Sequence, residues 1–444
     1  PVCKWLDPRQ KRSLERIFSS LEHRAGQSYS AALGSASRQA AHRIFGDERM
    51  TVDELLSGHY AETAERCARY ERVLVAQDTT ELDYKGHEGS KRGLGPLAGP
   101  KSWGMLSHEG LALTEAGEPL GLLAVELWSR DPEAAGSRHQ RPRRSATDKE
   151  SAKWGRTLSA VMERLPETTA AVVASDRESD VFAYLAQPRR TGVDLVVRAR
   201  HSRAVTLVET PGGTGKLFAE LRQAPVIGYR EFETCREGST TPERVTLSMS
   251  VLEVDVLRPQ SVSAREFADR VRCWAIRVWE EAPRVKSNRI EWYLLSTLPV
   301  HGPEDADRIA GYYGRRWRIE TLHKTLKSGI QVEDLQIPDT HSLKNAVAAH
   351  YVVACRVLRL TFAARTTPDG PPDEHLTPDE LTVLRAVSGK PIETVFEATV
   401  QVAKLAGYEP YRNAPPPGAL RVWAGLQRLA DMVIGFRAAN YDTR

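Results

Sequence analysis

The period of the hydrophobic positions changes several times along the chain, and each change predicts a different kind of element. Residues 1–70 carry apolar and small residues at helical spacing, which predicts a helical region. The apolar run "RVLVAQDTTEL" (72–82) predicts a buried strand that ends in an acid. Turn signals in "GLGPLAGP" and "EAGEP" then predict a hairpin or meander over residues 91–128.

The middle of the chain mixes apolar strands with helical segments. A helix is expected near 150–165, and "TTAAVVAS" (168–175) and "VDLVVRARH" (193–201) predict two more strands. This order of elements indicates an α/β layer fold. Two later stretches, "RVTLSMSVLEVDVL" and "VRCWAIRVWEE", alternate with period two and predict an inserted β-rich subdomain.

The last third of the chain is helical in pattern. A long helix is expected from about 342 to 364, "RTTPDGPPDEHLTPDE" reads as a linker, and "PPPG" at 415–418 precedes a final helix. We therefore predict the following ranges: a helical domain at 1–70, the first part of an α/β core at 71–204, a β subdomain at 205–300, core helices at 301–364, a linker at 365–380 and a helical domain at 381–444.

Composition narrows the class of protein. The 444 residues are 41% hydrophobic and 27% charged, the mean hydropathy is −0.43, and we expect no membrane span because no run of about 18 apolar residues occurs. The five cysteines form no CxxC pair, which argues for a reducing cytoplasm and against a zinc site or a disulfide framework.

Basic residues are concentrated near the N-terminus. Residues 1–50 hold nine Lys and Arg against five Asp and Glu, so this region alone accounts for the net charge of +4. Arg38, His42 and Arg43 form a stripe within it. Such a region suggests a polyanionic partner, although a solvated helical face explains the charge equally well. The basic stretch 129–150 also has two interpretations: it is either a disordered loop or an arm that touches phosphate.

The stretch "YYGRRWRIETLHKTLKSG" (312–329) reads as one helix with unusual chemistry on one face. Tyr313, Arg316, Glu320 and Lys327 fall within an arc of about 60° on a helical wheel. The apolar residues Ile319, Leu322 and Leu326 fall on a separate face. A phenol, two cations and an acid in one stripe suit a phosphate-bearing polymer, whereas the alternative is an ordinary solvated face.

Two aspartates follow apolar strands. Asp78 comes after "VLVAQ" and Asp176 after "AAVVAS". Strand ends of α/β sheets commonly form ligand crevices, and two such Asp with a Glu from a packed helix can hold two divalent cations about 4 Å apart. Oxygen ligands suit Mg²⁺, with Mn²⁺ as a substitute. A lone Asp after a strand is usually a turn or cap residue, so the prediction depends on the combination with Glu320.

With these residues in place, the chain resembles the DDE-type bacterial insertion-sequence transposases, and most of all the transposase of transposon five. The spacing of Tyr313, Arg316, Glu320 and Lys327 matches the helix signature of that family. Further similar motifs occur in the same order: "DTT" (78–80), "KESAKW" (149–154), "DRESD" (176–180), "VVRARH" (196–201) and "WYLLS" (292–296). The flanking stretches "GSASRQAAHRIFGD" and "LTPDELTVLRA" are also similar, so the resemblance covers nearly the whole chain.

The resemblance implies a fold and a set of roles. It implies a ribonuclease-H-like catalytic core with a β insertion, an N-terminal domain that binds transposon ends and a C-terminal dimerisation domain. The catalytic and metal-binding residues would be Asp78, Asp176 and Glu320, with two Mg²⁺ per site. The DNA contacts would be made by Tyr313, Arg316, Lys327, Trp292, Trp317, Arg198, Arg38 and Arg43. Trp292 matches a residue that holds a flipped base, and Trp317 could assist it.

The function expected from the resemblance is cut-and-paste DNA transposition in the bacterial cytoplasm. A homodimer in a synaptic complex would cleave the terminal inverted repeats, through a hairpin intermediate, and transfer the 3′-OH to target DNA. Three alternatives stay open: a structure-selective nuclease without strand transfer, a catalytically inactive DNA-binding relic, and a two-metal phosphatase for small molecules. No membrane partner is expected.

Overall fold

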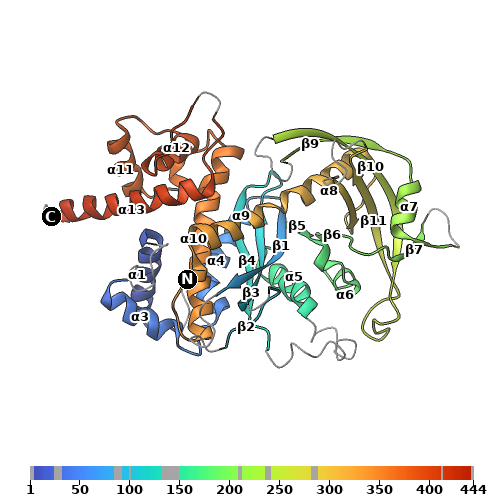
Figure 1. The fold of residues 1–444 in the computed structure, drawn as a ribbon, viewed down its shortest axis with the longest axis horizontal. Helices are drawn as coiled ribbons and strands as arrows, with labels where there is room; N and C mark the ends of the chain where they lie inside the picture. The colour runs from blue at the N-terminus through green and yellow to red at the C-terminus, as the bar shows by residue number, and fades with distance from the viewer. Residues whose placement is uncertain are drawn as a thin grey trace. The chain divides into compact units, whose positions relative to one another are not determined.

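The computed structural model describes residues 5–24, 33–84, 93–99, 102–131, 150–208, 213–235, 242–281, 289–411 and 414–441 (Figure 1). The chain divides into two units, which we describe separately. Unit 1 consists of Pro1–Arg69, Thr79–Gly136 and Arg318–Arg444, and unit 2 of Tyr70–Asp78 and Ser137–Trp317. The chain passes between the units after Arg69, after Asp78, after Gly136 and after Trp317.

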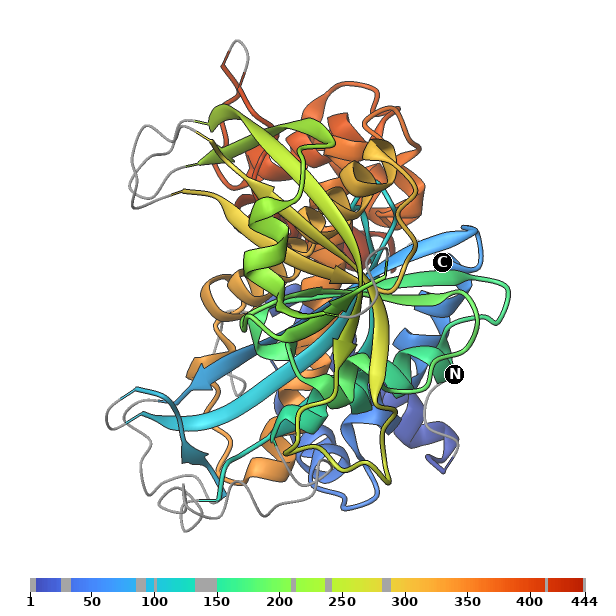
Figure 2. The same cartoon turned by 90° about the vertical axis from the view of Figure 1, so that its right-hand side faces the viewer.

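Unit 2 is built on a large mixed sheet, whose strands are blue (β1), green and yellow in Figure 2. Its first three strands are parallel and apolar, as expected for strands covered on both faces. The remaining pairs are antiparallel. In spatial order the strands are β1 (Arg72–Asp83, through its first half), β5 (Ala170–Ser175), β6 (Val193–Arg198), β12 (Glu291–Ser296), β11 (Arg270–Trp279), β10 (Pro242–Leu257), β7 (Ala204–Leu207) and β8 (Thr214–Lys216), and β9 (Gly228–Cys235) also pairs with β10.

The helices of unit 2 are short. In α5 the buried residues Trp154, Leu158 and Val161 recur at helical spacing, and the helix ends one residue before the Leu165–Pro166 bond. The helical elements are η3 (Glu150–Ala152), α5 (Lys153–Arg164), η4 (Arg177–Ser179), α6 (Phe182–Leu185), α7 (Leu217–Gln223) and α8 (Pro303–Arg315).

Unit 1 contains a small antiparallel sheet. Strand β3 (Trp103–Leu113) is hydrogen-bonded to β1 and pairs antiparallel with β4 (Pro119–Trp128) and with the short β2 (Gly95–Pro96). The β3–β4 turn contains Gly117 at φ +89°, a conformation that favours glycine. The predicted meander is therefore confirmed.

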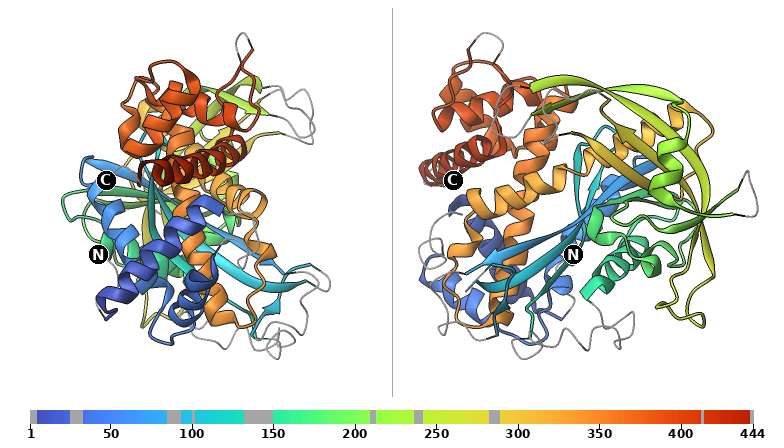
Figure 3. Two further views of the ribbon diagram at one scale, coloured as in Figure 1. Left: turned by 90° about the vertical axis from the view of Figure 1, so that its left-hand side faces the viewer. Right: turned by 45° about the vertical axis from the view of Figure 1, so that its right-hand side comes forward.

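The helices of unit 1 come from both ends of the chain and surround α10. This 27-residue helix, orange in Figure 3, packs against α3, α4, α12 and α13. The helical elements are α1 (Pro8–Arg24), α3 (Ser35–Phe45), α4 (Val52–Cys67), α9 (Arg318–Lys324), a π-helical segment (Thr325–Gly329), η7 (Val332–Asp334), α10 (Thr340–Thr366), η8 (Pro372–Glu374), α11 (Pro378–Ser388), α12 (Val395–Leu405) and α13 (Ala419–Tyr441).

Helix α10 is also long and apolar enough, by length and composition alone, to cross a membrane. Of its apolar 18-residue window, however, 83% is buried inside the protein. Its apolar residues therefore serve as the core of unit 1, as in the central helix of many globular proteins.

Two details of the sequence prediction are corrected. The strand at 72–82 does not end at Asp78 but continues to Asp83. The single helix expected over 312–329 is three segments: α8 ends at Arg315, a turn follows at Arg316 and Trp317, and α9 passes into the π-helical segment. The stripe of four residues on one straight helix is therefore wrong, although the apolar residues of the segment are buried as predicted.

Three further predictions of element type can be compared with the structure. The helical region at 1–70, the β-rich stretch at 205–300 and the long helix near 342–364 have the expected element types, whereas the exact domain ranges stay predictions. The predicted linker at 365–380 already contains η8 and the start of α11. The basic stretch 129–150 lies mostly outside the described residues.

Candidate active site

Asp78 and Asp176 occupy corresponding positions on neighbouring parallel strands of unit 2. The register of β1 and β5 ends with Gln77 opposite Ser175, so each aspartate is the next residue along its strand. Parallel strands lie about 4.8 Å apart, so the two carboxylates start from adjacent points on the backbone. Asp176 directly follows β5, as the sequence predicted, whereas Asp78 lies within β1 and not at its end. The register brings the two residues to neighbouring positions.

A third strand continues this row with a cation. Ser175 of β5 is registered with Val197 of β6, so Arg198 is the residue next to Asp176. Its guanidinium lies 3.4 Å from the Tyr313 hydroxyl of α8 and also donates to the Glu291 carbonyl oxygen at 3.3 Å. The row across the sheet is therefore two acids followed by one arginine.

Arg316 pairs with the first acid. Its Nη1 donates to Asp78 Oδ2 at 2.7 Å, and the side chains are only 6% and 16% exposed. Arg316 is the C-cap residue that follows α8, and its backbone N–H bonds the Tyr313 carbonyl. The arginine expected to grip phosphate thus contacts a predicted metal ligand.

The pKa of Asp176 is raised above its ordinary value by its surroundings. Burial raises the pKa of Asp176, and the nearby charge of Asp78 raises it further, whereas a backbone hydrogen bond and Arg316 act in the opposite direction. The side chain also caps η4 by accepting the Glu178 N–H at 2.9 Å. A carboxylate whose ionisation is disfavoured by burial and by a neighbouring acid is typical of functional sites.

The other acids of the "DRESD" motif have structural partners. Glu178 lies 3.5 Å from the Lys153 ammonium. Asp180 is buried and accepts the backbone N–H groups of Arg200 and His201 at 2.8 and 2.9 Å, and its Oδ1 accepts Arg203 Nε at 2.6 Å. Asp180 therefore fixes the chain after β6, a role that sequence reasoning did not assign.

The aromatic residues of the predicted DNA site differ in exposure. Trp292 is 8% exposed and packs edge-on against Tyr313 and Phe232, with ring centroids 5.2 and 5.4 Å apart. Tyr313 is 1% exposed, and its ring centroid lies 5.9 and 5.8 Å from the guanidinium carbons of Arg198 and Arg316. Trp317 is 57% exposed in the turn between the helices. Their contacts with DNA stay predictions.

Glu320 and Lys327 belong to unit 1. Glu320 is half-buried in the first turn of α9. Lys327 lies in the π-helical segment, where its Nζ donates to the Glu81 carbonyl at 2.9 Å and lies 3.6 Å from Glu333. Glu333 in turn accepts the Asp83 N–H at 2.8 Å. Lys327 is therefore anchored to the second half of β1, and the convergence of Glu320 with the two aspartates stays a prediction.

A metal ion is expected from the chemistry of the acids. Within the described part of the chain, no group of three or more His, Cys, Asp and Glu side chains is arranged to hold a metal ion. Asp78 and Asp176 supply oxygen donors that suit Mg²⁺, and a cation between them would relieve the repulsion that raises the pKa of Asp176. The pair thus fits part of a divalent cation site.

The predicted basic residues of the N-terminal region are exposed. Arg38, His42 and Arg43 lie on α3 and face solvent, while Ala41, Ile44 and Phe45 are buried. The helix is therefore amphipathic, with its cations available on the outer face.

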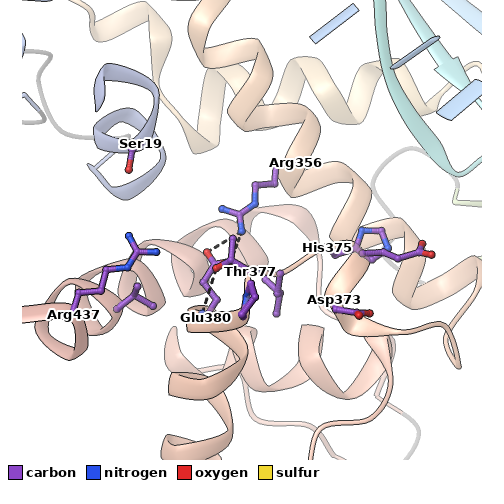
Figure 4. Close-up of a pocket in the computed structure, with 11 residues that line it drawn as sticks. Ser19, Arg356, Asp373, His375, Thr377, Glu380 and Arg437 are labelled. Atoms are coloured by element: carbon purple, nitrogen blue, oxygen red, sulfur yellow. Dashed lines mark hydrogen bonds and ion pairs between the residues drawn. The ribbon is translucent and has the colours of Figure 1, made fainter. Parts of the chain in front are cut away.

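A pocket elsewhere in unit 1 is lined by charged residues that the sequence analysis did not select (Figure 4). Its cavity volume is about 510 Å³. Arg356 donates to both Glu380 carboxylate oxygens, at 2.8 and 2.6 Å. Burial acts to raise the pKa of Glu380, but Arg356 and the Thr377 hydrogen bonds outweigh it, so the pKa is lowered. The opposite charges of Arg356 and Glu380 neutralise each other, which indicates that the pair has a structural role.

Comparison with models of known protein families finds no match. Among solved structures, the chain is similar to a piggyBac transposase synaptic complex with hairpin DNA, with a TM-score of 0.37 and 9% sequence identity over 98% of this chain and 73% of that chain. A likeness at this level does not establish a shared fold or function.

Proposed function

We propose that this protein is a DDE-type DNA transposase of the bacterial insertion-sequence kind, with a ribonuclease-H-like core. The observation that carries the proposal is the placement of Asp78 and Asp176 directly after the last registered pair of the parallel strands β1 and β5, Gln77 and Ser175. The raised pKa of Asp176, caused by burial and by Asp78, supports a cation-binding role for the pair. In the proposal, Glu320 is the third acid.

The proposed chemistry is phosphoryl transfer on DNA. Two Mg²⁺ ions held by Asp78, Asp176 and Glu320 would activate the attacking oxygen and stabilise the leaving oxygen. The chain's own part is to hold the acids on rigid strands and to orient the scissile phosphate. Arg316 suits the second task because a guanidinium can grip two phosphate oxygens at once.

The proposed DNA contacts use groups with different exposure. Trp317, Arg38 and Arg43 are exposed, so they can meet DNA without rearrangement of the protein. Lys327, Arg198, Tyr313 and Trp292 are buried or half-buried, so in the proposal they contact only the strand held in the active site. On the basis of the resemblance, the proposal also includes cleavage of the transposon ends through a hairpin, strand transfer by a homodimer and a cytoplasmic location.

The proposal is tested by Mg²⁺-dependent cleavage of end-labelled DNA that carries the element's own terminal repeats. The parent protein is compared with Asp78→Asn, Asp176→Asn and Glu320→Gln, and all four proteins are assayed for binding to the same DNA. We expect site-specific nicks and hairpins from the parent alone, with binding retained by the variants.

Other outcomes would overturn parts of the proposal. Equal cleavage by Glu320→Gln would remove the third acid from the site. Cleavage without joining to a target plasmid would favour a nuclease, and binding without cleavage by the parent would favour an inactive relic. Hydrolysis of a small phosphate ester, with DNA affinity that does not fall with salt, would favour a phosphatase.

A further inference from the structure

A buried polar network in unit 1 lies beside the helix that carries Glu320. At its centre is Glu109 of β3, which is 0% exposed. One carboxylate oxygen, Oε1, accepts the hydroxyls of Ser107 and Tyr351, and the other, Oε2, lies 2.7 Å from His323 Nε2. The hydroxyls of Ser107 and Tyr351 are themselves 2.8 Å apart. Both oxygens of the buried acid are therefore satisfied.

The network joins three elements that are distant in the sequence. Glu109 and Ser107 lie on β3, His323 lies on α9, and Tyr351 lies on α10. A carboxylate without hydrogen-bond donors would be very unfavourable in this interior, so the three elements must keep the spacing that satisfies Glu109. Apolar side chains could fill the same space, but they would not fix a direction for each contact.

His323 connects this network to the predicted third acid. It follows Glu320 by three residues in the seven-residue helix α9, so the two side chains emerge from neighbouring positions of the helix surface. A bond from His323 to β3 therefore restricts the rotation of α9 about its axis. Any such rotation would also move Glu320.

We propose that Glu109 and His323 are positioning residues that hold α9 in the orientation required for catalysis by Glu320. The proposal rests on the proposed function, because it assigns the network a purpose only if Glu320 binds the catalytic cations. Neither Glu109 nor His323 touches DNA or metal in it. Tyr351 and Ser107 complete the set of donors around Glu109.

The first test measures the orientation of α9 without using activity. Backbone hydrogen exchange over residues 318–329 is followed by mass spectrometry in the full chain, for the parent, Glu109→Gln, His323→Ala and His323→Gln. Thr399→Val is the matched control, since Thr399 is a fully buried hydroxyl in α12 that bonds Leu360 and Val395 carbonyls. We expect at least tenfold faster exchange over 318–329 in Glu109→Gln and His323→Ala, and parent-like exchange there in the control.

The second test measures single-turnover DNA cleavage and DNA affinity in the same proteins. Glu109→Gln and His323→Ala are expected to cleave at least tenfold more slowly with unchanged affinity, and His323→Gln, whose amide can still donate to Glu109, to recover part of the rate. Unchanged exchange over 318–329 would show that Glu109 and His323 do not hold α9 in its orientation. Faster exchange with parent-like cleavage would overturn its catalytic purpose, and a parent that binds but never cleaves would overturn the proposed function instead.

Discussion

Asp78 and Asp176 stand one residue beyond the last registered pair of β1 and β5, Gln77 and Ser175. This relationship brings together two acids that are almost a hundred residues apart in the sequence. It also explains why Asp176 is harder to ionise than an ordinary aspartate, since burial and the charge of Asp78 both raise its pKa. The consequences for stability can be measured.

Asp176→Asn should raise the melting temperature at pH 7 in the presence of a chelator. A raised pKa in the folded state means that ionised Asp176 destabilises the fold, so stability falls as pH rises from the unfolded value of 3.8 through the raised pKa. Asparagine removes this cost. Thermal unfolding at pH 7 and pH 3 checks the sign, because the benefit should disappear at pH 3, and equal melting temperatures at pH 7 would contradict it.

Mg²⁺ should raise the melting temperature of the parent but not that of Asp176→Asn. A ligand that binds only the folded state stabilises it in proportion to its occupancy. Thermal unfolding over a Mg²⁺ titration measures the effect, with K⁺ at matched ionic strength as the control. An equal rise in both proteins would show that Mg²⁺ acts elsewhere.

The Asp78–Arg316 ion pair should show a coupling free energy of about 1–3 kcal/mol. Both side chains are largely buried, so loss of either partner leaves an uncompensated charge. Chemical denaturation of Asp78→Asn, Arg316→Met and the double variant gives the coupling. Additive effects of the two single changes would mean that the pair contributes no interaction of its own.

Substitution by alanine should mainly weaken DNA binding at Trp317 and mainly lower the free energy of unfolding at Trp292. Trp317→Ala should change the free energy of unfolding by less than about 0.5 kcal/mol and weaken DNA binding, because the ring is exposed. Trp292→Ala should cost about 3–5 kcal/mol, because it removes a buried ring from its contacts with Tyr313 and Phe232. Denaturation and DNA titration of both variants separate packing from binding.

Arg38→Gln and Arg43→Gln should each reduce the salt dependence of DNA binding. Each phosphate contact that is lost lowers the slope of log K against log salt by about 0.9. Arg265→Gln is a matched control, since Arg265 is an exposed arginine in the β-rich stretch. If the control changes the slope as much as the α3 variants, the basic region has no special role.

Arg356→Met should destabilise unit 1 by about 3 kcal/mol at pH 7. It would leave Glu380 buried without the cation that lowers its pKa. Since a lowered pKa contributes stability that is lost as pH falls below the ordinary value of 4.5, the difference between parent and variant should shrink in acid. Denaturation at pH 7 and pH 3 measures both effects.

The sequence predicted most element types and both aspartates because these depend on local apolar pattern. The strand containing Asp78, the strand before Asp176 and the burial of Ile319, Leu322 and Leu326 are all visible in short windows of sequence. Periodicity gives no information about where a helix of constant pattern breaks. The turn at Arg316 and Trp317 therefore cannot be predicted from the hydrophobic pattern.

Contacts between residues that are far apart in the sequence cannot be predicted from local pattern either. Glu109 reads as one acid in a strand, and nothing near it signals contacts with His323 and Tyr351, which are 214 and 242 residues away. The pairing of Arg316 with Asp78 spans 238 residues in the same way. The available signal is an acid in the middle of a predicted strand, since a buried acid requires partners from elsewhere in the chain.

The π-helical segment at Thr325–Gly329 has a consequence for how the chain tolerates changes in length. Its Ile330 N–H bonds the Thr325 carbonyl at 2.8 Å, five residues back, so the turn holds one residue more than an α-helical turn. Deletion of a single residue here would restore ordinary helical winding and keep the helix intact. Because the wide turn holds the extra residue, the residues after it, toward η7, would keep the directions that they have now. The segment can therefore lose one residue without a change in the direction of the chain that follows.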